Sequence, residues 1–246
     1  MTSAPEKNVW TYDDFTSREL DSARWKIMAI NGADGERHRY QDRNARMRID
    51  EGRFEVTVNP FTRFHDTDPR QNNAKQMYQS VRRFPVPAAG DLTFEVEMGV
   101  RTYDQIPHDP LDAFGTVNLF DLDTGVVLNA AATNDALYAL VERLVIPGVT
   151  LPHEHYIHRV VLDVPTEPGL EHRYAVTYRA KTSEVEFRVD GELAYWARLP
   201  VPVAAFHAGM ALFSARDLSR YARAEREHGQ GATGRWGPWQ ITTSVR

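Results

Sequence analysis

Four polar side chains in the middle of the chain interrupt stretches that are otherwise apolar. Asn118 and Asn129 each lie within a short apolar run, and Tyr138 and Glu142 lie in a third run. A strand that is buried on both faces should be uniformly apolar, so polar residues within it indicate a binding site. We predict that Tyr138 and Glu142, which would share one face of a strand, transfer protons there. We predict that Asn118 and Asn129 bind the substrate. The alternative is structural, with amides that satisfy neighbouring backbone groups and a tyrosine in the core.

The segment 75–80 contributes two more predicted substrate-binding residues, Tyr78 and Gln79. As a strand, this segment would place Gln79 on the face that also carries Lys75 and Met77, with Tyr78 on the opposite face. The polar composition of the segment indicates that part of it faces a ligand rather than the core.

Three further candidates are His65, His228 and Gln230, and His65 is expected in a loop at the rim of the site. His65 precedes Asp66, and a carboxylate that orients the imidazole ring can make it a general base. Neighbouring side chains in an extended segment point apart, which weakens this pairing. The glycine-containing segment 228–231 lacks the Lys-Ser/Thr pair of a phosphate-binding loop, so we predict that His228 and Gln230 contact the substrate instead.

Several catalytic and metal-dependent classes are excluded or disfavoured. The chain contains no cysteine, which excludes thiolate catalysis, thiolate metal sites and disulfides. It also lacks the Gly-x-Ser-x-Gly motif of a serine nucleophile. His153, His155 and His158 could ligate zinc if they lay in a strand, but the prolines at 147 and 152 favour a loop. We therefore predict no bound metal at these histidines.

Composition and charge limit the partners. The 246 residues carry a formal net charge of −5 and are 42% hydrophobic, as in a folded domain. The acidic balance argues against a nucleic-acid partner, and we interpret the basic segment 37–48 as a charged strand edge or loop. No apolar stretch approaches the ~18 residues of a membrane span. The first residues contain no apolar signal segment, which predicts a cytoplasmic location.

The elements that must position these residues are strands, because the dominant period of the chain is two. Alternating apolar residues are found in the segments 53–58, 92–98, 174–178, 184–189 and 192–196. Asp190-Gly191 supplies the positive φ angles of a tight hairpin turn. Only the region near 216–227 has helix-forming composition, and we expect one short surface helix or a charged loop there. The chain is therefore predicted to be an all-β, single-domain antiparallel sandwich over residues 1–246.

Three segments together resemble the concanavalin-A-like jelly rolls, the superfamily of laminarinase-type glycoside hydrolases and many lectins. They are the opening Asp13-Asp14-Phe15 with Leu20, Asp21 and Trp25, the hairpin with Val-Asp-Gly in 172–192, and the final strand 239–241. This resemblance implies a jelly roll whose last strand lies beside the first and whose concave sheet carries the ligand. A closer resemblance, over residues 114–128, 133–144 and 228–239, is to an uncharacterised and mainly actinobacterial family within that superfamily.

The hydrolase machinery of the superfamily is missing. Laminarinase-type hydrolases carry Glu-x-Asp-x-(x)-Glu on one strand, whose alternation directs the carboxylates into the cleft. Glu95 and Glu97 share a face, but no Asp lies between them and no third acid follows. Glu184 and Glu186 lie beside a hairpin, and the acids at 121 and 123 lie in a turn. We interpret all of these as a solvated face or a turn, which disfavours glycoside hydrolysis.

A structural calcium ion is also implied by some members of the superfamily, near the opening Asp-Asp-Phe and the last strand. Here Asp13 or Asp14 could bind calcium, but Gln240 stands where an acidic ligand would be expected. We predict no cofactor, with calcium at one of these aspartates as the alternative.

Two function classes remain open. We predict a cytoplasmic enzyme that binds a small organic molecule in the concave cleft and performs metal-free acid–base or shape-driven chemistry. Such an isomerase, lyase or cyclase, for example in natural-product biosynthesis, needs positioned groups and a preorganised pocket. The alternative is a non-catalytic carbohydrate-binding or interaction module with a glycan in the cleft, which would show exposed aromatic platforms and no group with a shifted pKa. The oligomeric state is left open.

Overall fold

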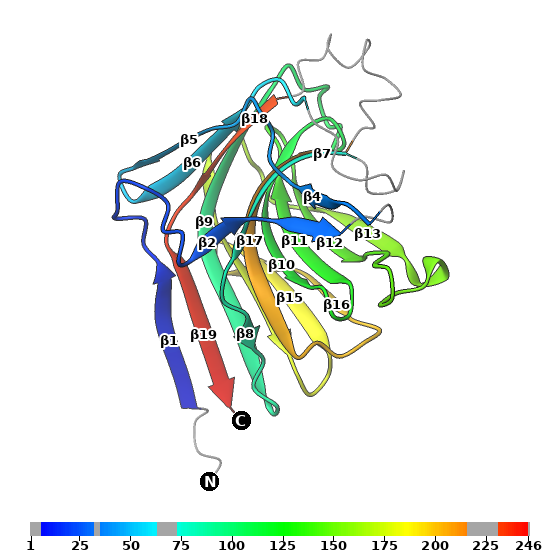
Figure 1. Cartoon of the computed structure of the whole chain (residues 1–246). Coiled ribbons are helices and arrows are strands. Elements are labelled where there is room, and N and C mark those ends of the chain that lie inside the picture. The colour runs from blue at the N-terminus through cyan, green and yellow to red at the C-terminus, as the bar shows by residue number, and fades with distance from the viewer. Residues whose placement is uncertain (1–5, 32–34, 63–72, 216–230, 246) are drawn as a thin grey trace.

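The fold consists of two antiparallel β-sheets that face each other, as Figure 1 shows. The computed structural model describes residues 6–31, 35–62, 73–215 and 231–245. The nine-stranded sheet contains, in spatial order, β16 (Glu192–Arg198), β15 (Glu184–Val189), β14 (Glu171–Arg179), β9 (Gly90–Tyr103), β18 (Gly231–Trp236), β6 (Arg53–Val58) and β5 (Arg46–Asp50). Beside β9 lies also β19 (Trp239–Val245), which pairs in turn with β1 (Glu6–Asp13).

The eight-stranded sheet faces it with strands from the middle of the chain. Its spatial order is β13 (Tyr156–Leu162), β12 (Leu137–Arg143), β11 (Val126–Ala132), β10 (Phe114–Asp121), β17 (Ala205–Ser214), β7 (Ala74–Ser80) and β2 (Trp25–Ile27), with β8 (Phe84–Pro85) also paired to β17. A two-stranded ribbon, β3 (Ala29–Asn31) and β4 (Arg37–Arg39), follows β2. The described residues contain one 3₁₀ turn, η1 (Pro152–Glu154), and no α-helix.

The nine-stranded sheet has one apolar and one polar face. Buried and partly exposed residues alternate strictly along β6, β14 and β15, because successive side chains of a strand point to opposite faces. The inward set packs against the other sheet in one core that includes Trp25, Trp236 and Trp239. Asp190 and Gly191 both have positive φ, at 52° and 90°, and close the β15–β16 hairpin as predicted.

The eight-stranded sheet is covered on both faces. Every residue of β7, β10 and β11 is buried, which the alternation of a one-sided sheet cannot produce. One face belongs to the sandwich core, and the other carries a separate apolar cluster that includes Met77, Phe120 and Phe213. Met28 and Tyr40, which flank the ribbon, belong to this second cluster. Their backbones are hydrogen-bonded to β7, because the N–H of Met28 donates to Met77 O and that of Met77 donates to Tyr40 O.

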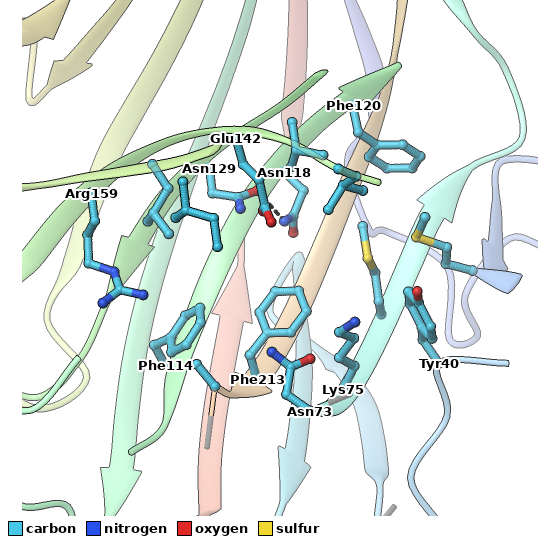
Figure 2. A pocket seen from close by; sticks show the side chains of 17 residues that line it. Tyr40, Asn73, Lys75, Phe114, Asn118, Phe120, Asn129, Glu142, Arg159 and Phe213 are labelled. Carbon is cyan, nitrogen blue, oxygen red and sulfur yellow. Dashed lines mark hydrogen bonds between the residues drawn. The ribbon is translucent and has the colours of Figure 1, made fainter. Parts of the chain in front are cut away.

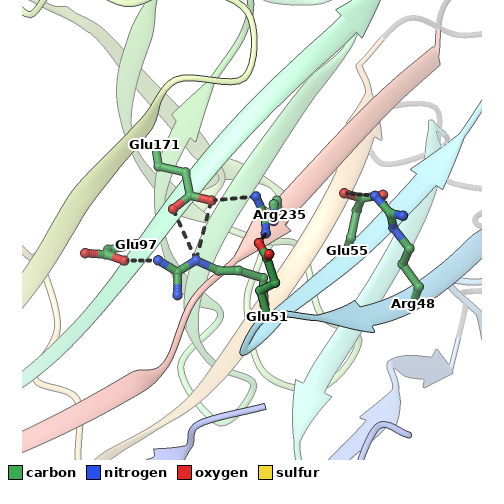
Figure 3. Close-up of polar contacts among 7 residues, drawn as sticks. Arg48, Glu51, Glu55, Glu97, Glu171 and Arg235 are labelled. Atoms are coloured by element: carbon green, nitrogen blue, oxygen red, sulfur yellow. Dashed lines mark hydrogen bonds and ion pairs between the residues drawn. The ribbon is translucent and has the colours of Figure 1, made fainter. Parts of the chain in front are cut away.

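Several charged side chains on the outer face of the nine-stranded sheet form ion pairs (Figure 3). Arg53 Nη2 lies 2.5 Å from Glu97 Oε2, and Arg53 Nε lies 3.1 Å from Glu171 Oε2. Arg235 bridges Glu171 and Glu51 at 3.6 and 3.5 Å. Glu97, considered above as half of a catalytic pair, therefore lies on the side of the sandwich away from the cleft and is an ion-pair partner.

The predicted all-β jelly-roll sandwich is confirmed in its main features. The last strand pairs with the first, with Ile241 opposite Trp10, and residues 137–143 form a strand. The loop that the prolines suggested ends earlier than expected, because residues 156–162 pair with β12 as the edge strand β13. The region near 216–227, where a short helix was predicted, lies outside the described residues. No helix in the described ranges has the length and apolar character that crossing a membrane requires.

Candidate functional site

A pocket lies on the face of the eight-stranded sheet that is turned away from the sandwich core (Figure 2). We refer to it as the cleft pocket. Its cavity volume is about 120 Å³. Most of its wall is apolar and is formed by residues of the second cluster, including Met28, Met77, Phe114, Phe120, Leu140 and Phe213. The polar groups in this wall are few, which is typical of small-molecule sites.

Two asparagines form a hydrogen-bonded pair in the floor of the cleft pocket. Asn118 on β10 lies opposite Asn129 on β11, and they are 1% and 6% exposed. Thr116 Oγ1 donates to Asn118 Oδ1 at 2.6 Å, and Asn118 Nδ2 donates to Asn129 Oδ1. Within the described part of the chain, Asn129 Nδ2 donates to no partner. The prediction that both residues reach the cleft agrees with the structure, and the amides bond to each other rather than to backbone.

Glu142 places a carboxyl group in this apolar surrounding. Its side chain is 16% exposed, and burial raises its pKa to about 7, although the positive charges of Lys75 and Arg159 oppose the shift. His155 Nε2 lies 3.9 Å from Glu142 Oε1. A carboxyl group with this pKa is close to half ionised at neutral pH, so it can both accept and donate a proton.

Two cationic side chains flank the pocket, and neither was among the predicted site residues. Figure 2 shows Arg159 and Lys75 entering from opposite sides, with the Glu142 carboxyl between them. Lys75 Nζ lies 4.5 Å from the centre of the Tyr40 ring. Alternation along residues 75–80 had placed Lys75 on the same face as Met77, so Lys75 could have been predicted as a site residue from the sequence. Arg159 was missed because the segment before it was interpreted as a loop.

Tyr138 lies on the predicted face but outside the cleft pocket. It shares the face of Leu140 and Glu142 on β12 and is 3% exposed within the second apolar cluster. Burial raises the pKa of its phenol, with a further contribution from the Asp135 carboxylate. The structure does not bring Tyr138 together with Glu142 in the pocket, so its predicted catalytic role loses its geometric basis.

Tyr78 points to the opposite side of its strand. Its ring packs edge-on against Phe54 in the sandwich core at 5.0 Å, and its hydroxyl donates to Met47 Sδ at 3.7 Å. Burial raises its pKa to about 12. Tyr78 was predicted to bind a ligand in the cleft, but its side chain does not reach the cleft. It follows Met77 on the strand, so it points to the opposite face, into the sandwich core. Gln79 is on the cleft side of the sheet and is buried, but it does not line the pocket.

The remaining predicted residues, His65, His228 and Gln230, lie outside the described residues. Among the residues that are described, Glu142 is the one carboxylate that lines the cleft pocket.

No group of three or more histidine, aspartate and glutamate side chains in the described ranges is placed to hold a metal ion. Asp13, one of the two aspartates considered for calcium, has other partners in the described structure. Asp13 accepts hydrogen bonds from Trp25 Nε1 at 2.8 Å and from the Phe15 backbone N–H at 3.0 Å, and Arg24 Nη1 lies 3.4 Å away. Each oxygen of this carboxylate therefore already contacts a donor or a cation.

Comparisons with known proteins agree with this fold. A family model described as "Family of unknown function (DUF6081)" matches residues 12–245. No curated protein matches the chain. An endo-1,3-β-glucanase (laminarinase) catalytic domain from Thermotoga petrophila is similar in structure, with a TM-score of 0.62, 12% identity and coverage of 97% of this chain and 98% of that one.

Two other solved structures have the same architecture. An endo-1,3-β-glucanase from Streptomyces sioyaensis has a TM-score of 0.60 and 13% identity, and covers 100% of this chain and 99% of that one. Porphyranase B from Zobellia galactanivorans has a TM-score of 0.60 and 12% identity, and covers 96% of this chain and 94% of that one. At these identities the likeness confirms the laminarinase-type jelly roll and leaves the chemistry to the site itself.

Proposed function

The chain belongs to the DUF6081 family of unknown function, and we propose that it is an enzyme that binds a small cyclic molecule in the cleft pocket and transfers a proton through Glu142. The position of Glu142 carries this proposal. A carboxyl group in an apolar pocket, held between two cations and next to the asparagine pair, is expensive to bury and contributes little to folding. Such groups are concentrated at functional sites.

The size and lining of the pocket support a single ring as ligand. A cavity of about 120 Å³ is close to the engineered cavity of ~150 Å³ that binds benzene. Phe114 and Phe213, whose ring centres are 5.3 Å apart, offer aromatic faces and edges to such a ring. Parts of a larger ligand would extend out of the open side of the cleft.

The polar groups support acid–base chemistry next to a carbonyl or hydroxyl oxygen. Ionised Glu142 would remove a proton from the ligand, and protonated Glu142 would return one at a different atom. The Asn129 amide and the Arg159 guanidinium are donors that would stabilise negative charge developing on the ligand oxygen. Base-initiated isomerisation, elimination and cyclisation next to a carbonyl group proceed through such charge.

Solvent exchange of a simple cyclic ketone tests this proposal. Cyclohexanone in D₂O at pH 7 would be followed by proton NMR with and without the protein. We expect the protein to accelerate deuterium exchange at the carbons next to the carbonyl, and we expect Glu142→Gln to abolish the acceleration. Glu171→Gln, on the outer face, is the matched control. Ketone binding without accelerated exchange would remove the catalytic part of the proposal.

A carbohydrate-binding module is the second candidate, favoured by the structural likeness to two glucanases and a porphyranase. Hydrolysis of a glycosidic bond normally needs two carboxylates, and the described part of the pocket wall provides one. Non-catalytic binding of a glycan remains compatible with the fold. Saturation of the protein by laminari-oligosaccharides, with no response to cyclic ketones or aromatic acids, would favour this candidate.

A further inference from the structure

Arg159 differs from many arginines of this structure in its surroundings. Arg48, Arg53, Arg83 and Arg179 each contact a carboxylate at 2.5 to 2.8 Å. Within the described part of the chain, Arg159 forms no hydrogen bond and no ion pair, although it lines the cleft pocket from the edge strand β13. A guanidinium group has five donors in a fork that matches a carboxylate, so this arrangement leaves a strong anion-binding group facing the pocket.

The charged residues of the pocket wall also favour an anionic ligand. Lys75 and Arg159 are the cations in the described wall, and Glu142 is the carboxyl group that faces them. Because the pKa of Glu142 is raised to about 7, its negative charge is only partly present at neutral pH. The other titratable groups nearby are His155, which faces Glu142, and Tyr40, whose ring contacts Lys75. Among the described residues of the wall, two cationic side chains therefore stand against one partly ionised carboxyl group.

The floor of the pocket also offers hydrogen-bond donors. The carbonyl oxygen of Asn118 accepts from Thr116, and that of Asn129 accepts from Asn118. Each amide oxygen thus already accepts one hydrogen bond, and within the described part of the chain the N–H groups of Asn129 are left to donate. A ligand with acceptor atoms would complement these N–H groups.

We infer that the ligand of the cleft pocket is a small cyclic organic acid, whose ring packs among the phenylalanines and whose carboxylate is bound by the Arg159 guanidinium. The inference rests on the proposed function and narrows its substrate class. Asn129 donates to an oxygen of the same ligand, and Lys75 adds positive charge on the opposite side. Glu142, when protonated, adds a further donor.

Matched probes separate this inference from the proposed function. Benzoate and benzamide have the same ring and nearly the same shape but differ in charge, and their dissociation constants would be measured by ligand-observed NMR at low ionic strength. We expect benzoate to bind about tenfold more tightly than benzamide, because one charge-assisted contact contributes ~1.5 kcal/mol or more. We expect added salt to reduce this preference.

Variants then locate the preference in the pocket. Arg159→Gln should remove it, and Arg159→Lys should retain part of it by keeping the charge without the fork. Arg198→Gln, an exposed arginine of β16 that pairs with Glu184, is the control and should change neither constant. Equal binding of the two probes, or a preference that survives Arg159→Gln, would overturn the inference while leaving ring binding intact. Absence of binding by both probes would overturn the proposed function as well.

Discussion

The cleft face of the eight-stranded sheet and the outer face of the nine-stranded sheet both carry arginine and glutamate side chains, in opposite arrangements. On the outer face, Arg53 lies within 2.5 and 3.1 Å of two carboxylates. In the cleft, Glu142 and Arg159 both line an apolar pocket, and within the described part of the chain they form no ion pair with each other. Charges that neutralise each other stabilise a surface modestly, whereas charges kept apart in an apolar pocket remain available to a ligand.

The largest expected effect is the loss of proton transfer on changing Glu142. Glu142→Gln keeps the shape of the side chain but cannot accept a proton, so we expect the exchange rate to fall by about 10²-fold or more. Glu171→Gln, which disturbs the outer-face network instead, should leave the rate within experimental error. A Glu142→Gln variant with full exchange activity would contradict the proposal that the cleft face transfers protons through Glu142.

The pH dependence of stability should also distinguish the two faces. The pKa of Glu142 is raised from 4.5 to about 7, so the folded state holds a proton that the unfolded state loses between these values. The stability due to this proton is fully present below pH 4.5 and is lost as the pH rises through about 7.

Urea unfolding at pH 4.5 and pH 8 measures this difference. We expect Glu142→Gln to be more stable relative to the wild type at pH 8 than at pH 4.5, by at most about 3 kcal/mol. A difference between variant and wild type that does not change with pH would show that the carboxyl group is better solvated than its position in the pocket implies.

The next largest effect on stability is expected from the asparagine pair. Asn118→Ala removes the donor to Asn129 and the acceptor for Thr116 in a fully buried position. We expect the free energy of unfolding to fall by about 2 kcal/mol, because buried polar groups are left without partners. Asn8→Ala, on the exposed part of β1, is the control and should change it little. A small effect of Asn118→Ala would mean that water replaces the lost amide from the pocket side.

The smallest effect is expected on the outer face. Arg53→Ala breaks contacts to Glu97 and Glu171, which are both partly exposed. We expect a loss of about 1 kcal/mol, since solvent screens such pairs, and no change in benzoate binding. A change in ligand binding from this distant site would contradict the separation of the two faces.

Most of the fold could be predicted from local patterns. Residues 53–58 and 184–189 alternate in sequence as they do in burial, and Asp190-Gly191 closes the hairpin. These features depend on neighbours in the chain, which the sequence displays directly. Asn118, Asn129 and Glu142 could be predicted as site residues for a related reason, since they are polar interruptions in strands that are otherwise apolar.

The rest of the site depends on contacts between distant parts of the chain. Arg53 and Glu171 are 118 positions apart. Nothing local in the sequence distinguishes such an ion-paired arginine from Arg159, which lines the pocket. Tyr78 and Met77 are adjacent, yet one packs in the core and the other lines the pocket. Phe114 and Phe213 look like ordinary core residues in the sequence, because a second covered face can be recognised only when both layers are known.

The separation of the two apolar clusters has a consequence for how this fold can diverge. The strands β7, β10, β11, β12 and β17 contribute alternate residues to the sandwich core and to the cleft cluster, and the two clusters have no side chain in common. Substitutions at every second position of these strands can therefore change the shape and polarity of the pocket, while the intervening residues keep the sheets together. Relatives with different ligands could arise on this scaffold by mutation of one face alone.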